Sequence, residues 1–356
     1  MSYQDLILAF VPAADSERYH IITHSPAEGQ IVASFVSPFG EERINTWRHG
    51  LNPSEIRLIG SLLYRRVFSP DIHRAFDACR RFAQRQGLAL RVKLILDAVL
   101  SQLPWEFLYE PEANQFLALD QRVAIVRYFD LPLPRSSSRY ANGLRLSLFV
   151  PDDVAALEHQ PLMALAGQPD AQIHVLTLDE IENSAKNFLN LQVLHLQAAS
   201  GRDPASGHYA LRIGENAGTR WLTEDAVARW LRANASIQLV VLDASQGSDA
   251  TTREASALAA NLVERGVVPS AVALQFPLGS VLRAEFLKTF YHALANNDGL
   301  DLAMTEARRA IAAIGGTWEW GAPVLYSALR DDQPRLEPQQ RHTKALLPNV
   351  PINVRQ

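Results

Sequence analysis

Hydrophobic and polar positions alternate along this chain with two periods, one typical of strands and one typical of helices. Apolar runs at 6–12 and 30–38, rich in β-branched and aromatic residues and separated by a polar stretch, predict two strands. Residues 88–96 alternate apolar side chains with Arg91 and Lys93, which predicts a third strand. Further apolar runs follow at 103–111, 116–119 and 123–129.

Two helices are expected between these strands. Asn52-Pro53 is a typical helix start, and the apolar positions after it recur at helical spacing to about Phe68. A second helix is predicted after Ser69-Pro70, ending near Gly87. Strands and helices are therefore mixed in the first part of the chain.

The second half of the chain alternates strand and helix more regularly. Its strand candidates are apolar almost throughout, and amphipathic segments separate them, which favours a mainly parallel sheet covered by helices on both faces. In such a sheet, functional groups gather where loops leave the C-terminal ends of strands. The predicted strands are 144–151, 173–179, 191–198, 237–244, 270–276 and 322–328, and the predicted helices are 153–166, 180–189, 223–234, 252–265, 279–296 and 299–313.

Composition shifts divide the chain into four parts. Residues 1–135 form an N-terminal α/β segment, and a stretch rich in Pro, Ser and Gly places a linker at 136–143. The core is predicted at 144–330. A polar tail with several prolines at 331–356 is expected to be disordered.

Composition and charge exclude several classes of function. With 47% hydrophobic and 20% charged residues, the chain is expected to fold into a globular core. A net charge of −4 without a basic run disfavours a nucleic-acid partner, and no segment is apolar enough to predict a membrane helix. The single cysteine, Cys79, forms no internal disulfide, so the expected compartment is the cytoplasm. No metal-binding spacing or phosphate-binding loop occurs, so no metal or cofactor is expected.

Six sequence phrases occur in order along the chain. The first is centred on Leu103-Pro104-Trp105-Glu106, and the phrase at 266–311 contains Gln275-Phe276-Pro277 followed by two helical segments. Together they resemble the CHAT domain, a branch of the caspase and separase superfamily, over nearly the whole chain. The resemblance implies a caspase-like, mostly parallel α/β sheet. For the class, it implies cysteine-type endopeptidase action on a protein substrate in bacterial conflict and programmed-death systems. The phrases lie at 88–129, 144–153, 191–201, 237–247, 266–311 and 320–326.

The resemblance also assigns a catalytic dyad, and neither of its side chains is present. The nucleophilic cysteine position is Ser245, and the histidine position is Ala199, or Ser200 if the register slips by one. A thiol is used in this chemistry because its thiolate is accessible near neutral pH, whereas a serine needs a well-placed base. Gly201 is expected to supply an oxyanion N–H group. A peptidase mechanism of this type is therefore not expected to run in this chain.

Three further residues are predicted to contact a substrate, and two of them, Asp243 and Gln275, have a structural alternative. Asp243 lies two residues before position 245, where it would shape a pocket for a basic side chain, or would be a buried acid satisfied by protein donors. Gln246 follows position 245 directly. Gln275 leaves a core strand on the same rim and would contact a peptide backbone, or would serve only in the turn.

Other candidates are interpreted mainly as structural. His195 is a candidate displaced base for Ser245, but a hydrogen-bonded histidine within the sheet is preferred; His208 is expected in a solvated hairpin. Trp105 and Glu106 are interpreted as a structural pin between the N-terminal segment and the core.

Three hypotheses about function follow. The first is a pseudoprotease that binds or regulates a protein partner, with the partner encoded nearby as one option. The second is an active CHAT cysteine endopeptidase in which Cys to Ser at 245 and His to Ala at 199 have been introduced. The third is a serine hydrolase that uses Ser245 with His195 or His208. A homo-oligomer is left open by the sequence.

Overall fold

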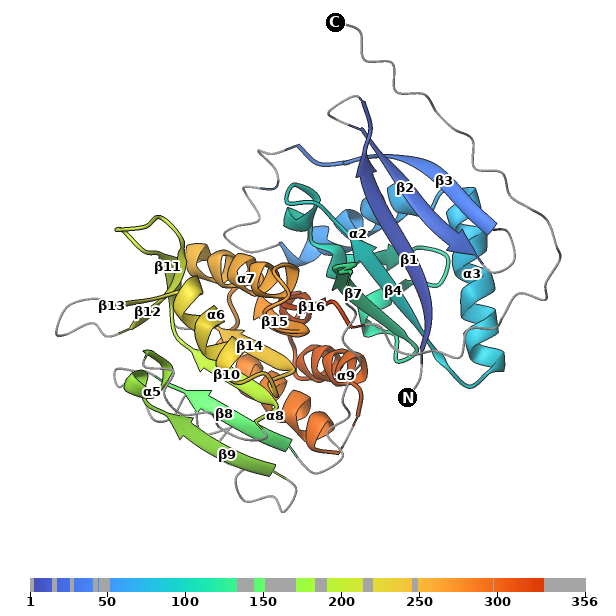
Figure 1. Ribbon diagram of the computed structural model, residues 1–356. Helices are drawn as coiled ribbons and strands as arrows, with labels where there is room; N and C mark the ends of the chain where they lie inside the picture. Colours follow the sequence, from blue (N-terminus) through green and yellow to red (C-terminus); the bar gives the residue numbers. More distant parts are fainter. Residues whose placement is uncertain are drawn as a thin grey trace, which may run out of the picture.

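One eleven-stranded sheet runs through the molecule (Figure 1). The computed structural model describes residues 3–14, 18–25, 29–40, 44, 52–132, 144–150, 171–182, 191–213, 220–244, 249–296 and 298–329. The predicted helix at 153–166, the predicted linker at 136–143 and the predicted tail at 331–356 lie outside these residues.

The strand order of the large sheet brings both halves of the chain together. Neighbouring strands are antiparallel at three places, β3–β2, β2–β1 and β16–β15, and parallel at the other seven. The predicted α/β class with a mostly parallel sheet is confirmed. In spatial order the strands are β3 (Gly29–Val36), β2 (Arg18–Ser25), β1 (Tyr3–Pro12), β4 (Ala89–Ile95), β7 (Val123–Tyr128), β16 (Pro323–Ser327), β15 (Ser270–Leu274), β14 (Leu239–Asp243), β10 (Val193–Gln197), β8 (Leu144–Phe149) and β9 (Ala171–Leu176).

Helices cover both faces of the central strands of this sheet because these strands are apolar on both faces. Along β14, Val240 and Leu242 pack with α6 (Glu224–Ala233) and α7 (Asp249–Glu264), whereas Val241 packs toward α8 (Ser280–Ala295) and α9 (Leu300–Ala313). At the other end of the sheet, α2 (Pro53–Val67) and α3 (Pro70–Arg85) pack on one face of β1–β3. Asn52 caps α2 through its side chain, as its position before Pro53 predicts.

The alternation along β4 does not separate a buried face from an exposed one. Arg91 and Lys93 are both only 3% exposed. Asp5 pairs with both cations, and Asp301 of α9 pairs with Arg91. Buried charges of this kind require such partners, so the polar positions of β4 hold α9 and β1 to the strand.

Two short regions differ from a simple strand pattern. The polar stretch between the first two predicted strands contains β2, which the sequence analysis missed. Apolar residues at 103–111 and 116–119 form 3₁₀ turns at Trp105–Phe107 and Leu117–Leu119 and a two-residue hairpin, β5 (Tyr109–Glu110) with β6 (Gln115–Phe116). The remaining described elements are the 3₁₀ turns Leu100–Gln102 and Glu319–Gly321 and the helix α5 (Leu178–Glu182).

A second, three-stranded antiparallel sheet stands at the end of β10. It consists of β11 (Ser200–Arg202), β12 (Tyr209–Ile213) and β13 (Arg220–Thr223). The hairpin predicted around His208 is confirmed, because β11 and β12 pair on either side of it. No helix in the described part of the chain has the length and apolarity to cross a bilayer.

Candidate functional site

The carboxyl ends of β10 and β14 lie side by side at one edge of the sheet. The strands are parallel neighbours, and Gln197 is paired in register with Asp243. The Ala198 N–H donates to the Asp243 carbonyl, which continues the ladder one step further. Position 199 is two residues beyond the end of β10, and position 245 is two residues beyond the end of β14. Residues 245–248 lie outside the described residues, so Ser245 and Gln246 remain predictions.

The second sheet holds Ala199 and Gly201 in place. The Arg212 N–H of β12 donates to the Ala199 carbonyl at 2.7 Å, and the Ala199 side chain is buried. Gly201 lies in β11 opposite Ala210, against the indole ring of Trp221. A Cβ at position 201 would lie 2.8 Å from two carbons of that ring, so only glycine fits without displacing Trp221.

Four buried polar side chains meet just below these strand ends. The Asp243 carboxylate accepts a hydrogen bond from Arg283 Nε at 2.7 Å and lies 3.5 Å from His195 Nε2. On the other side of the imidazole, His195 Nδ1 is 2.8 Å from the Tyr291 hydroxyl. Arg283 and Tyr291 both come from α8, so this helix neutralises the end of β14 and holds the histidine of β10.

The electrostatics of this cluster fix its protonation states. Burial alone would raise the pKa of Asp243, but the charge of Arg283, its hydrogen bond to Asp243 and the nearby His195 ring outweigh it and hold that pKa far below its usual range. Burial lowers the pKa of His195, and Asp243 offsets this only in part. At neutral pH the cluster is therefore an aspartate–arginine ion pair beside a neutral histidine.

Gln197 is the residue at this edge that the sequence analysis missed. It is fully buried, and neither its amide nitrogen nor its amide oxygen has a hydrogen-bond partner among the described residues. The second oxygen of Asp243, its register partner, is unsatisfied in the same way. Buried polar atoms normally have partners, so these unsatisfied groups distinguish the carboxyl ends of β10 and β14 from the apolar strands behind them. A lone Gln at the end of an apolar strand gave no signal in the sequence.

Comparison with known proteins identifies the family. The family model of the CHAT domain matches residues 57–327, well over half of the chain. The chain belongs to the CHAT-domain family. The match begins inside α2, so β1–β3 lie outside it and the matched region is shorter than the resemblance predicted. No curated protein matches the sequence significantly.

A remote match to this CHAT-domain chain is found among the solved structures. It is the crystal structure of the Saccharomyces cerevisiae separase–securin complex, with 12% sequence identity and a TM-score of 0.38. The match covers 85% of this chain and 20% of that one. A TM-score of this size is not a basis for inference, so the fold class stated above rests on the strand order and register of the chain itself.

In this CHAT domain, Gln275 is part of a buried network with Glu106. The Gln275 amide donates to Glu106 Oε2 and to the Gly321 carbonyl, and its oxygen accepts from Arg127. Arg127 also donates from two nitrogens to the Glu106 carboxylate. All the usual hydrogen bonds of the Gln275 amide are made within the protein. Glu106 thus joins the N-terminal segment to the segment after β15, which confirms its interpretation as a structural pin.

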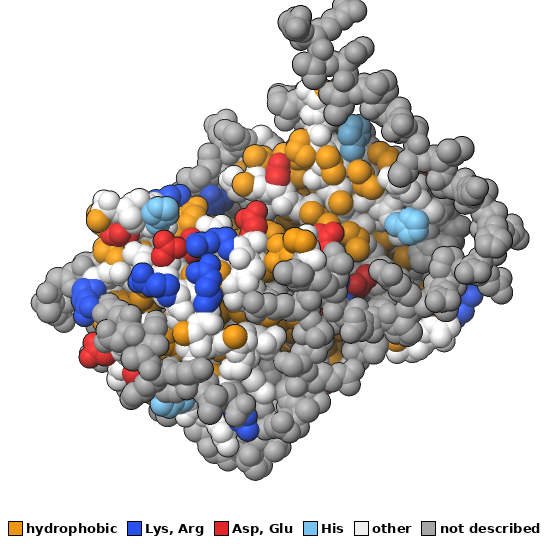
Figure 2. Space-filling view, in the orientation of Figure 1, with side chains coloured by type: hydrophobic (Ala, Val, Ile, Leu, Met, Phe, Trp, Pro, Cys, Tyr) orange, Lys and Arg blue, Asp and Glu red, His pale blue; other side chains and the backbone are white. Residues whose placement is uncertain are grey.

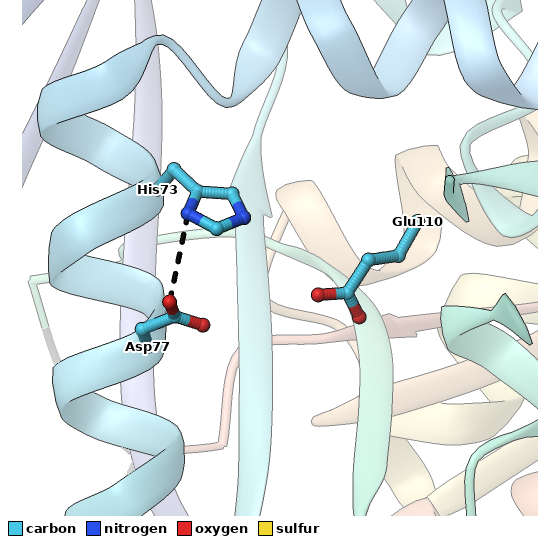
Figure 3. Close-up of side chains that lie close together, drawn as sticks. All are labelled: His73, Asp77 and Glu110. Atoms are coloured by element: carbon cyan, nitrogen blue, oxygen red, sulfur yellow. Dashed lines mark ion pairs between the residues drawn. The ribbon is translucent and has the colours of Figure 1, made fainter. Parts of the chain in front are cut away.

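One group of side chains in the described residues could bring three ligand atoms to a metal ion. His73 and Asp77, one turn apart on α3, and Glu110 of β5 point toward a common gap (Figure 3). Their ligand atoms lie within 4.8 Å of one another. However, Arg80 Nη1 is 2.9 Å from one Glu110 oxygen and 3.2 Å from the other, and Arg80 also pairs with Asp120. An ion-pair network already accounts for this cluster, and it is not on the strands that carry positions 199 and 245.

Proposed function

We propose that this chain is a CHAT-type pseudoprotease that binds or regulates a protein partner without cutting it, in a bacterial conflict or defence pathway. The partner would meet the edge where β10 and β14 end, because this is where the family resemblance places the dyad. Gly201, held tightly against Trp221, retains the glycine backbone of that edge. The cytoplasm remains the proposed compartment, since the single cysteine is buried and unpaired.

The observation that carries this proposal is the state of His195. It is the imidazole on β10 that could replace the missing base, yet it is fully buried between Tyr291 and Asp243. Both ring nitrogens already face these residues, and burial keeps the ring neutral by lowering its pKa. A general base must reach the proton that it removes, and His195 has no such access without breaking this cluster.

His208 is no better placed as a base for Ser245. In the β11–β12 hairpin, Arg212 pairs with Ala199, whereas His208 pairs with Asp203 near the turn. Four residues of extended chain therefore separate His208 from the Ala199 position, about 13 Å along the strand. The serine hydrolase hypothesis thus lacks a base in the described part of the chain.

The second candidate is an active cysteine endopeptidase whose dyad has been substituted at both positions. Its support is that the surroundings of the dyad are intact: β10 and β14 end in register, and α7 begins four residues after position 245. A helix N-terminus stabilises a nearby anion and would favour a thiolate there.

One experiment separates these candidates. The double variant A199H/S245C is incubated with purified proteins encoded beside this chain, and cleavage is followed by mass spectrometry. The pseudoprotease proposal predicts that the unmodified chain binds one of these proteins in calorimetry without cutting it. It also predicts that the double variant does not gain efficient cleavage, because the groove is no longer maintained for turnover.

The single variants A199H and S245C serve as matched controls. Specific cleavage by the double variant alone would overturn the pseudoprotease proposal and favour the substituted peptidase. Labelling of Ser245 in the folded, unmodified chain by a fluorophosphonate would overturn it in favour of a serine hydrolase.

A further inference from the structure

An apolar stripe crosses the outer face of the sheet at its N-terminal end. Ile95 of β4 is paired in register with Ala9 of β1, Ala9 with Ile22 of β2, and Ile22 with Val32 of β3. Residues directly opposite one another on neighbouring strands point to the same face. These four apolar side chains therefore form one continuous line across four strands.

The stripe is widened by exposed neighbours on the same face. Ile7, Val11, Val32 and Val36 each expose between 40% and 56% of their surface, which is unusual for several large apolar residues on one sheet face. Figure 2 shows hydrophobic surface gathered where Figure 1 places β1–β3, with histidine at its margin. Contiguous apolar patches of this kind mark binding surfaces more often than isolated exposed residues do.

The helix layer on this face stops at β4. Asp301 of α9 pairs with Arg91 on this face of β4, whereas Ile7 on the next strand is 40% exposed. On the opposite face, α3 packs against β1, β2 and β3. In the described part of the chain, β1–β3 are thus covered on one face only.

The described chain ends on the uncovered side. The Leu329 carbonyl accepts a hydrogen bond from Lys93 Nζ at 3.4 Å. Lys93 is the register partner of Ile7, so the Leu329 carbonyl, which this side chain reaches, lies on the face of the sheet that carries the apolar stripe. A later segment of this chain could therefore reach the apolar stripe from Leu329 without crossing to the other face of the sheet.

We propose that residues 345–354 of the same chain pack onto this face. This segment, ALLPNVPINV, is the apolar part of an otherwise polar stretch after Leu329. Fifteen residues lie between Leu329 and Ala345 and span up to about 50 Å, whereas β16, which Leu329 follows, and β3 are five strand spacings apart, about 24 Å. Pro348 and Pro351 lack N–H donors, so the segment would bind through side chains rather than by adding a strand at the edge of β3.

Limited trypsin digestion tests this docking. Cleavage between Lys344 and Ala345 is followed by mass spectrometry in the full chain and in the variants V32E and I7E. Burial of one valine corresponds to a factor of about ten in the docking equilibrium, so each variant is expected to be cut about tenfold faster. L58E, at a residue of α2 that is 54% exposed, is the matched control and is expected to be cut at the unmodified rate. Thermal melting shows that each variant is folded before digestion.

A crosslinking experiment gives an independent result. The pair V32C/I352C is treated with a short bismaleimide, and an intramolecular crosslink is expected, whereas L58C/I352C gives none. Cys79 does not compete, because burial raises the pKa of its thiol to about 11. Equal digestion rates in all variants, or crosslinks only between two chains, would overturn the proposal; the latter result would assign the face to a second copy.

Discussion

Asp243 and Arg283 show how a charged residue is retained at the end of an almost wholly apolar strand. Both side chains are 3% exposed, and the pair is neutral overall. Removing one partner of such a pair leaves an uncompensated buried charge, which is far more destabilising than replacing both. Arg283 already supplies the positive charge that the sequence-based hypothesis assigned to a substrate side chain. We therefore propose that Asp243 anchors β14 to α8.

The neutral state of His195 gives the protein a defined pH dependence. Because burial lowers the folded-state pKa of His195, the unfolded chain takes up a proton near pH 6.5 that the folded chain does not. The contribution of this residue to stability is therefore complete above pH 6.5 and is lost as the pH falls below it. At pH 5.5 the loss is at most about 1.4 kcal/mol, the limit set by the unfolded-state pKa of about 6.5. Urea unfolding between pH 7.5 and 5.5 measures it.

The variant H195N is the control for this prediction. H195N lacks the titrating group, so its unfolding free energy is expected to be lower overall. The slope of its unfolding free energy against pH, between pH 7.5 and 5.5, is expected to be shallower than that of the unmodified chain. Identical slopes for the two proteins would show that His195 titrates normally and that the buried cluster is not as described.

Gly201 gives a second prediction at this scale. Alanine at this position would place its Cβ against the ring of Trp221, and G201A is expected to lose about 1–3 kcal/mol of unfolding free energy because the indole must move. G40A is the matched control, since nothing lies within 4 Å of a Cβ there. Chemical denaturation measures both, and equal effects of the two substitutions would contradict the assigned packing.

The sequence located some positions at this edge of the sheet and missed others for a physical reason. Ala199 and Gly201 could be located from the family phrase, because they follow β10 by a fixed number of residues. The partner of Asp243 could not be located, since Arg283 lies 40 residues away on a helix whose rotation the pattern does not fix. Gln197 gave no signal because its unsatisfied state depends on neighbours in three dimensions.

Among the elements, the 3₁₀ turn at Trp105–Phe107 has the largest structural role for its length. It places Glu106 against Arg127 of β7 and against Gln275, which follows β15. Burial alone would raise the pKa of Glu106, but the charge and hydrogen bonds of Arg127 outweigh burial and keep this pKa low. Arg308 of α9 also lies in the field of this carboxylate. One carboxylate thus compensates cations from two elements.

We expect E106Q to destabilise the protein by about 3–5 kcal/mol, because Arg127 would remain buried without its carboxylate. Urea unfolding of the purified variant measures this change. The control is K288Q, which breaks the pair between Lys288 and Glu285; Lys288 is 71% exposed, and the expected change is below about 0.5 kcal/mol. A loss for E106Q as small as that of the control would show that the network contributes little.

Element prediction succeeded where local pattern decides the structure. Asn52 and Pro53 specify the start of α2 by capping chemistry, and the apolar runs of the second half specify strands because both of their faces are buried. It failed for β2, where Ile21 faces the core but His20 and His24 interrupt the apolar run. Edge-proximal strands with one exposed face carry a weaker signal than central ones.

At the scale of the whole molecule, the sheet joins the two predicted segments. A mainly parallel sheet followed from the alternation of strands and helices, but the strand order did not. The last strand, β16, inserts between β7 and β15 and runs antiparallel to β15. Pairings between residues this far apart in sequence depend on the packing of the complete chain, and a local pattern does not encode them.

The central claim at this scale is that positions 199 and 245 face each other across adjacent strand ends. A histidine next to a cysteine lowers the thiol pKa from about 8.5 toward 3.5–7.5. The pKa of the thiol introduced in S245C can therefore report whether a side chain at position 199 is near. Cys79 does not interfere, because it is buried and its thiol pKa is raised.

The most direct measurement is the pH dependence of alkylation by iodoacetamide at position 245, read by mass spectrometry in S245C and in A199H/S245C. The account predicts a thiol pKa at least about one unit lower in the double variant, because the new imidazolium would stabilise the thiolate across the strand ends. Equal pKa values in two folded variants would place the side chains apart and contradict the account.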